Sequence, residues 1–152
     1  MSASVTLYVV HHADAVSPDV DPQRPLSASG VAHVQRLARE AAEKGVKPDA
    51  IWHSGKLRAR QTAEAFWRAC NPLAPFEAVR GLQPEDPPVI MKDRVWGDTR
   101  TIMLVGHQPH LSRLLALLTR QEESETWFPA HGILALETEG ESGVWREAWR
   151  LT

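Results

Sequence analysis

The chain has little of several residue types, and each shortage excludes a class of protein. Its single cysteine, Cys70, cannot form a disulfide within the chain, so a disulfide-stabilised scaffold is excluded. No apolar run approaches the roughly 18 residues that a membrane-spanning helix needs. The formal net charge of −2 gives no general attraction to polyanions. We therefore expect neither nucleic acid nor a membrane among its partners.

The amino-terminal residues, Met1 to Ser4, contain no basic segment and lead directly into an apolar run. This pattern predicts no secretory signal and favours a cytoplasmic location. At 152 residues, with 43% hydrophobic and 24% charged, the chain has the size and composition of one globular domain. We expect that domain to span residues 1–152.

The order of apolar patterns predicts the fold class. Strand-like runs lie near residues 5–10, 50–53, 76–79, 101–106, 132–137 and 144–150. Helical periodicity predicts helices from Ser27 to Gly45 and over residues 58–69 and 109–118. This alternation predicts an α/β three-layer sandwich with a mostly parallel central sheet. The last two strands flank a predicted hairpin turn at residues 139–143, which favours an antiparallel edge strand. The prolines at 84, 87 and 88 predict a loop.

Two of the apolar runs end in histidine. Residues 7–10 lead into His11 and His12, and residues 102–106 lead into His107. Because ligands of open parallel sheets bind beyond the carboxyl ends of the strands, we expect these side chains to share one site. A third run, residues 51–53, ends in the same way and leads towards Arg58.

Arginines near these strand ends suggest an anion as the ligand. Arg58 follows the polar turn at Ser54 and opens a predicted helix, where backbone amides and a guanidinium both favour phosphate. Arg24 precedes the first predicted helix. Either arginine alone is more often a solvated surface charge. Beside two histidines, they fit phosphoryl transfer through a nucleophilic imidazole.

A metal site is the competing use of these residues. Its candidate ligands are His11, His12, Asp14, His53 and His107. The chain has no His-x-His pair and no His-x-x-x-His on a helix, and neighbouring strand residues such as His11 and His12 should point to opposite faces. The nearby arginines would also repel a cation. We therefore expect no metal and no other cofactor.

Four motifs in a fixed order extend this interpretation. They are His11-His12-Ala13-Asp14-Ala15, Arg24-Pro25-Leu26-Ser27 with Gly30, Ser54-Gly55-Lys56-Leu57-Arg58-Ala59-Arg60-Gln61-Thr62, and Gly106-His107-Gln108-Pro109. Their order and separation resemble the histidine phosphatase superfamily, and in particular its small SixA-type phosphohistidine phosphatase branch. The resemblance spans essentially the whole chain and implies a phosphoglycerate mutase-like fold.

The resemblance also implies a role for each matching residue. His12 would be the nucleophile that becomes transiently phosphorylated, while Arg58 and His107 would hold the phosphoryl oxygens. Arg24 and Ser54 would be supporting phosphate contacts. The implied activity is a metal-independent phosphatase. Its implied substrate is phosphohistidine on a protein, such as a phosphotransfer domain, or a small phosphorylated molecule.

The chain departs from the family motifs at three positions. His11 stands where the family has arginine, Ala13 where it has glycine, and Gly55 where it has proline. We still expect His11 to contact the phosphate, and a bound dianion could protonate it. Loss of a charged contact can cost about 10²–10³ in rate. The alternative function is therefore a catalytically weakened relative that binds a phosphorylated ligand or partner. Ala13 is costly only if its turn needs a positive φ.

The group that protonates the leaving atom has several candidates. Glu85 and Asp86 lie where larger relatives carry an acid, although two solvated loop carboxylates explain them equally well. Asp14 is nearby and can cap its loop. His131 precedes the fifth predicted strand and is either a rim residue of the site or a structural one.

Overall fold

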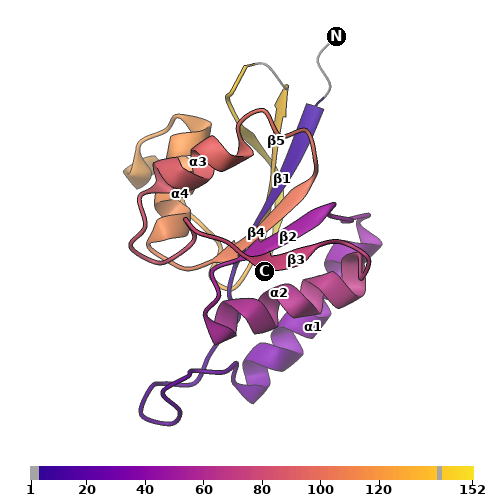
Figure 1. Ribbon diagram of the computed structural model, residues 1–152, viewed down its shortest axis with the longest axis vertical. Coiled ribbons are helices and arrows are strands. Elements are labelled where there is room, and N and C mark those ends of the chain that lie inside the picture. The colour runs from indigo at the N-terminus through magenta and orange to yellow at the C-terminus, as the bar shows by residue number, and fades with distance from the viewer. Residues whose placement is uncertain (1–3, 140–141) are drawn as a thin grey trace.

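Six strands form the central sheet of the computed structural model, which describes residues 4–139 and 142–152 (Figure 1). They are β1 (Ser4–His11), β2 (Ala50–His53), β3 (Phe76–Ala78), β4 (Ile102–Gly106), β5 (Ile133–Glu139) and β6 (Arg146–Leu151). Their order across the sheet is β3-β2-β4-β1-β5-β6. The first four are parallel, whereas β5 pairs antiparallel with β1 and β6 antiparallel with β5. The predicted mostly parallel sheet with an antiparallel edge is confirmed. The predicted hairpin turn falls partly on residues 140–141, outside the described residues.

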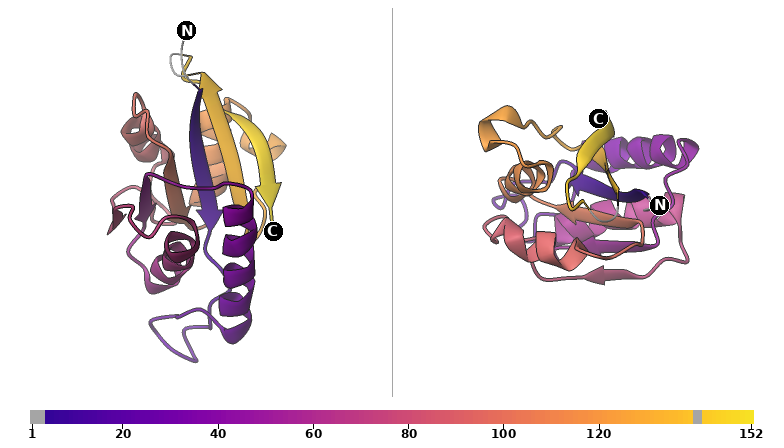
Figure 2. Two further views of the ribbon diagram at one scale, coloured as in Figure 1. Left: turned by 90° about the vertical axis from the view of Figure 1, so that its right-hand side faces the viewer. Right: turned by 90° about the horizontal axis from the view of Figure 1, so that it is seen from above.

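Helices cover both faces of this sheet, so the predicted three layers are confirmed (Figures 1 and 2). One layer holds α1 (Ala28–Glu43) and α2 (Leu57–Cys70), and the other holds α3 (Pro88–Val95) and α4 (His110–Thr119). A short 3-10 helix spans Glu123–Glu125. No helix within the described ranges combines the length and apolar character needed to cross a membrane.

The alternation of side chains along β1 divides the core between the two layers. Leu7 and Val9 belong to the cluster that includes the buried residues of α3 and α4. Tyr8 and Val10 belong to the cluster that includes those of α1 and α2. Successive strand residues point to opposite faces, so one strand supplies both cores. Because β1 and β4 lie in the middle of the sheet, the loops that follow them are held in place from both sides.

The helix α3 was missed because prolines mark its start. Pro88 occupies its first turn, where a missing N–H is harmless and a fixed φ suits the helix, and Pro87 is its N-cap. The prediction of a loop across all three prolines is therefore wrong from Pro88 onwards. Met91 and Val95 bury the inner face of this short helix.

The start of α1 closes against the loop that follows β1. Ser27 is its N-cap, as predicted, and its Oγ accepts a hydrogen bond from Gly30 N at 3.0 Å. A Cβ on Gly30 would lie 2.1 Å from the carbonyl oxygen of Asp14, so no larger residue fits without movement of the backbone. The Asp14 carboxylate accepts a hydrogen bond from the Ser27 hydroxyl at 2.7 Å, so it ties its loop to the helix.

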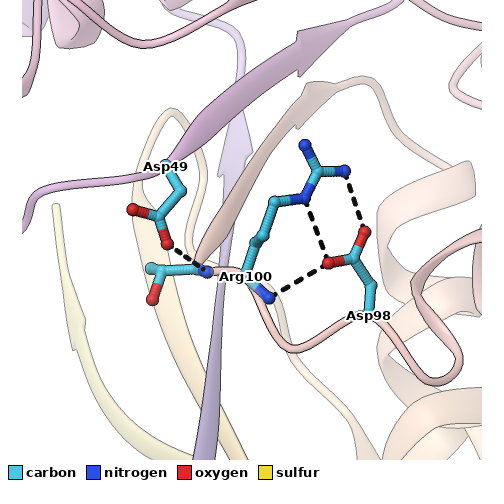
Figure 3. A network of polar contacts seen from close by, with 4 residues as sticks. Asp49, Asp98 and Arg100 are labelled. Atoms are coloured by element: carbon cyan, nitrogen blue, oxygen red, sulfur yellow. Dashed lines mark hydrogen bonds and ion pairs between the residues drawn. The ribbon is translucent and has the colours of Figure 1, made fainter.

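The amino ends of β2 and β4 carry a closed polar network (Figure 3). The Asp98 carboxylate accepts hydrogen bonds from the Arg100 guanidinium at 3.1 and 2.9 Å. The Asp49 carboxylate accepts from Thr101 N at 2.9 Å. Each ionised group in this network has a partner inside the protein.

Candidate functional site

The site begins where β1 and β4 end side by side. The two strands are parallel and place His11 opposite Gly106. His12 N donates to Gly106 O at 3.1 Å, which sets the next residue of each strand, His12 and His107, beside each other. Their ring centroids lie 5.1 Å apart. The two strand ends thus meet at one edge of the sheet, as the sequence predicted.

His12 presents an unprotonated nitrogen. Its Nδ1 lies 2.7 Å from the carbonyl oxygen of Ala13, and since a carbonyl only accepts, the ring proton sits on Nδ1. The lone pair is therefore on Nε2. Burial and the charge of Arg58 together lower the pKa of His12 to about 4, against the opposing effect of the bond to Ala13. A neutral imidazole with a free Nε2 is the nucleophilic form.

The loop after His12 is held by α2. Ala13 N donates to Thr62 Oγ1 at 2.9 Å, and that hydroxyl donates to Arg58 O at 2.8 Å. Leu26 N donates to Gln61 Oε1 at 2.8 Å. Gln61 and Thr62 lie within one of the sequence motifs, but no role was predicted for them. In the structure, their side chains accept hydrogen bonds from two loops of the site and hold these loops against α2, the helix that carries Arg58. Ala13 does not have a positive φ, so its replacement of glycine costs no backbone strain.

Two arginines bring positive charge to His12. Arg58 is the second residue of α2, and its Nε is buried without a hydrogen-bond partner in the described chain. Burial and the nearby charge of Arg24 lower the pKa of Arg58. Arg24 has φ of 51° and donates from Nε to Val16 O at 2.9 Å. Neither arginine forms an ion pair with any described carboxylate. This charge is available to an anion.

His107 and Ser54 form a buried pair next to His12. The His107 Nε2 lies 2.6 Å from Ser54 Oγ, and both residues are buried. Burial, together with His12 and Arg58, lowers the pKa of His107 to about 3. Gln83 Nε2 donates to Ser54 O at 2.6 Å. Ser54, predicted as a phosphate contact, therefore also holds the ring of His107 in place.

Gly55 takes a conformation that proline cannot adopt. Its φ is +93°, whereas proline is restricted to about −65°. Its N–H donates to His53 Nδ1 at 3.0 Å, a bond that proline would also lack. The turn that leads from β2 into α2 therefore suits the glycine of this chain.

His11 and His131 form a stacked pair beside the nucleophile. Their rings are nearly parallel, at 8°, with centroids 4.8 Å apart. His131 N donates to His11 Nδ1 at 2.8 Å, and His131 Nδ1 donates to the His12 carbonyl at 2.7 Å. Burial, together with the neighbouring imidazoles, lowers the pKa of His11 to about 3. Sequence reasoning treated His131 as a rim residue or a structural one. In the structure it contacts His11, the last residue of β1, and His12, the residue after it.

The expectation that His11 and His12 point apart is wrong. Their ring centroids lie 4.6 Å apart. The reason is that β1 ends at His11, so the alternation of strand side chains no longer applies to His12. As a result, His11, His12 and His131 each offer a ring nitrogen within 4.8 Å of the others, a grouping that could hold a metal ion. Sequence spacing did not reveal this grouping, although the charges of Arg58 and Arg24 oppose a cation there.

The two predicted acids lie in different surroundings. Glu85 is 79% exposed and lies 3.6 Å from Arg113 on α4. Asp86 accepts a hydrogen bond from Gln83 N at 2.9 Å and lines a cavity of about 450 Å³ that Ser54 also lines. Of the two carboxylates, Asp86 shares a cavity with the site, whereas Glu85 is engaged with Arg113.

Comparison with known proteins agrees with this arrangement. The family model of the histidine phosphatase superfamily (branch 1) matches residues 12–84, which include His12, Arg24 and Arg58. No curated protein sequence matches the chain.

Solved structures match nearly the whole chain. The protein histidine phosphatase SixA in complex with tungstate is similar with a TM-score of 0.86 and 22% identity, over 97% of each chain. A protein from Agrobacterium tumefaciens, described as a phosphohistidine phosphatase SixA, gives 0.81 and 25% over 99% of each chain. A mycobacterial glucosyl-3-phosphoglycerate phosphatase gives 0.73 and 13%, over 96% of this chain and 98% of the other. The fold is therefore phosphoglycerate mutase-like, as predicted.

Proposed function

The chain is similar to the histidine phosphatase superfamily over residues 12–84, and from that premise we propose that it hydrolyses a phosphoryl group through a covalent phosphohistidine on His12. The observation that carries the proposal is the unprotonated His12 Nε2 beside two arginines that have no carboxylate partner in the described chain. This combination provides both a nucleophile and a binding charge for a phosphoryl dianion.

The reaction would proceed in two displacements. His12 Nε2 attacks phosphorus in line, an N–P bond forms, and the bond to the leaving oxygen or nitrogen breaks. Arg58 and Arg24 stabilise the charge on the equatorial oxygens, with His107 and His11 beside them. Asp86 is the better placed of the two predicted carboxylates to give the leaving atom a proton. Water then attacks phospho-His12, which releases phosphate and restores the imidazole.

The proposed substrate is phosphohistidine on a protein, such as a phosphotransfer domain, with a small phosphomonoester as the alternative within the same chemistry. Similarity to two SixA-type structures over nearly their full lengths supports the first. Similarity in fold to a glucosyl-3-phosphoglycerate phosphatase keeps the second open. We propose that the reaction takes place in the cytoplasm and needs no metal.

The test is phosphate release from an aryl phosphate and from a phosphohistidine protein, with chelator present. The native protein should turn over both, and brief reaction should leave acid-labile, base-stable phosphate on His12, seen by mass spectrometry. His12→Ala should lose at least about 10³-fold in kcat. His33→Gln replaces a histidine outside the nucleophile's contacts and is the matched control. Undiminished turnover by His12→Ala would exclude this nucleophile, and loss of native activity with chelator would support a metallohydrolase.

His11 supports a second candidate function, that of a phospho-ligand binding module. It replaces a permanent charge with an imidazole whose pKa burial lowers to about 3. The discriminating experiment compares the native protein with His11→Arg on both substrates. Activity that rises from near zero in His11→Arg favours the binding module. Comparable activity in both proteins favours an enzyme adapted to His11.

A further inference from the structure

His131 has a backbone conformation that few residues adopt, and three contacts hold it there. Its φ is 53°, in the left-handed region that costs free energy for a residue with a side chain. Its N–H donates to His11 Nδ1, its ring Nδ1 donates to the His12 carbonyl, and its own carbonyl accepts from His33 Nε2 at 3.1 Å. All three partners are histidines; His11 is the last residue of β1 and His12 follows it.

These bonds determine where the ring protons lie. An amide N–H only donates, so His11 Nδ1 holds a lone pair and the His11 proton is on Nε2. A carbonyl only accepts, so His131 Nδ1 carries the proton and His131 Nε2 holds a lone pair. A second proton on His11 would require its bond to the His131 amide to break. A second proton on His131 would break no bond, because its Nε2 has no hydrogen-bond partner in the described chain.

We infer that His131 is the residue at which this site takes up a proton when it binds a phosphoryl dianion. The proton adds to Nε2, Nδ1–H keeps its bond to the His12 carbonyl, and the cation formed lies on the ring stacked against His11. The bound dianion supplies the favourable interaction for that charge. From the sequence, a bound dianion could protonate His11 itself. The hydrogen bonds instead assign the titratable charge that replaces the family arginine to the neighbouring ring.

The groups around His131 explain why the proton arrives with the ligand. On β1 it faces His11 and His12, and α1 contributes His33. Arg24 and Arg58 act on His12 from the first loop and from α2. A cation on His131 would therefore join a site that already has uncompensated positive charge. The charged residues Glu147 and Arg150 lie on β6, the strand that pairs with β5. They hydrogen-bond to each other, so their charges offset one another.

Sulfate is the probe, because it is a dianion that does not itself titrate near neutral pH. The inference rests on the proposed function only in taking the ligand to be such a dianion. Calorimetric titration at pH 7 in buffers of different ionisation enthalpy gives the number of protons taken up on binding. The native protein should take up about one proton. Its affinity for sulfate should fall by up to about tenfold for each pH unit above neutral.

His131→Asn is the main variant, since asparagine tolerates a left-handed backbone and its amide can still donate to the His12 carbonyl. It should bind sulfate without proton uptake and with little dependence on pH. His131→Gly, which keeps the amide bond to His11 and removes the ring, should behave in the same way. His33→Gln removes a different imidazole but keeps a donor for the His131 carbonyl, so it should retain native uptake.

Each outcome bears on a different claim. Native binding without proton uptake overturns the inference and leaves the proposed function standing. Uptake that persists in both His131 variants overturns it as well, since the proton then lies on another histidine, such as His11, His12 or His107. A native protein that binds no sulfate at all counts against both the inference and the proposed function.

Discussion

Arg100 precedes β4 at the amino end of the parallel strands, whereas Arg58 follows β2 at their carboxyl end. Arg100 is bound by Asp98 through two guanidinium nitrogens, and this partner raises the pKa of Arg100 (Figure 3). Arg58 has no ion-pair partner in the described chain, and burial together with Arg24 lowers its pKa. The same residue type is therefore neutralised at one end of the sheet and left uncompensated at the other.

The histidines extend this contrast between the two ends. His11, His12 and His107 all lie at the carboxyl end, and burial lowers the pKa of each. They remain neutral there, and no described carboxylate forms an ion pair with Arg24 or Arg58. An anion would supply the missing charge. The difference between the ends supports the proposal that the carboxyl end of the sheet binds an anion, whereas the paired charges of the amino end serve the fold.

Removing each arginine in turn is the strongest way to break the comparison. Arg58→Met should lower kcat/KM for an aryl phosphate by about 10²–10³-fold, because it removes a charged contact to the transition-state oxygens. Arg58→Lys should recover part of that loss, since the charge returns without the fork. Arg100→Met is the matched control and should leave kcat/KM unchanged. Equal losses in the two methionine variants would show that the ends do not differ in function.

On acidification, the buried histidines of the carboxyl end should lower the free energy of unfolding at a higher pH than Asp98 of the amino end does. The pKa of His107 falls from 6.5 to about 3 on folding, so between these pH values the unfolded chain binds more protons. The free energy of unfolding therefore decreases as the pH falls below 6.5, by up to about 1.4 kcal/mol per pH unit for each such histidine. Asp98 has a lowered pKa, and its contribution is lost only as the pH falls below its ordinary 3.8.

Urea unfolding at pH 7, 6, 5 and 4.5, in buffers without phosphate or sulfate, measures this dependence. His107→Gln keeps a polar group for Ser54 and removes one titrating site, so its stability should fall less on acidification than that of the native protein. Superimposable pH profiles for the two proteins would contradict the assignment of His107 as a buried neutral imidazole.

Two buried threonines, Thr62 and Thr138, allow the two ends of the sheet to be compared with the same substitution. Thr62→Val leaves the Ala13 amide without its acceptor, at a cost of about 1–3 kcal/mol, and loosens the loop that places His12. We expect kcat to fall by about tenfold or more as the nucleophile shifts. Thr138 is buried on β5, where it pairs with Val5 at the amino end of β1, and its hydroxyl donates to Val144 O at 2.6 Å. Thr138→Val should lose comparable stability by thermal unfolding and keep native kcat.

Much of the carboxyl end could be predicted from the sequence because strand ends are local features. An apolar run that stops at His12 or His107 shows where each strand ends, and parallel strands bring such ends together. Arg58 was found in the same way, as the start of the helix that follows β2. The antiparallel edge followed from two strand patterns joined by a short turn.

What could not be predicted depends on backbone geometry or on distant contacts. No sequence pattern predicts the left-handed conformation of His131. Its hydrogen bond to His11 joins residues 120 positions apart, which periodicity cannot reveal. The orientation of His12 depended on the exact residue at which β1 ends, which periodicity locates only within a few residues. The helix α3 was missed because Pro87 and Pro88, which begin it, also fit a loop.

Asp98→Asn tests the amino end and should give the smallest effect. Asparagine keeps an oxygen that can accept from Arg100 N but removes the charge that its guanidinium binds. The Arg100 side chain is 49% exposed, so water and salt screen the pair, and the free energy of unfolding should fall by about 1 kcal/mol or less. Thermal unfolding at low and high salt measures this, and the difference between the two proteins should shrink at high salt. The kinetic constants of Asp98→Asn should match those of the native protein, because water and salt screen this change of charge before it reaches the opposite edge of the sheet. A loss of kcat as large as that of Thr62→Val would mean that the two ends of the sheet are coupled, and that the division between them does not hold.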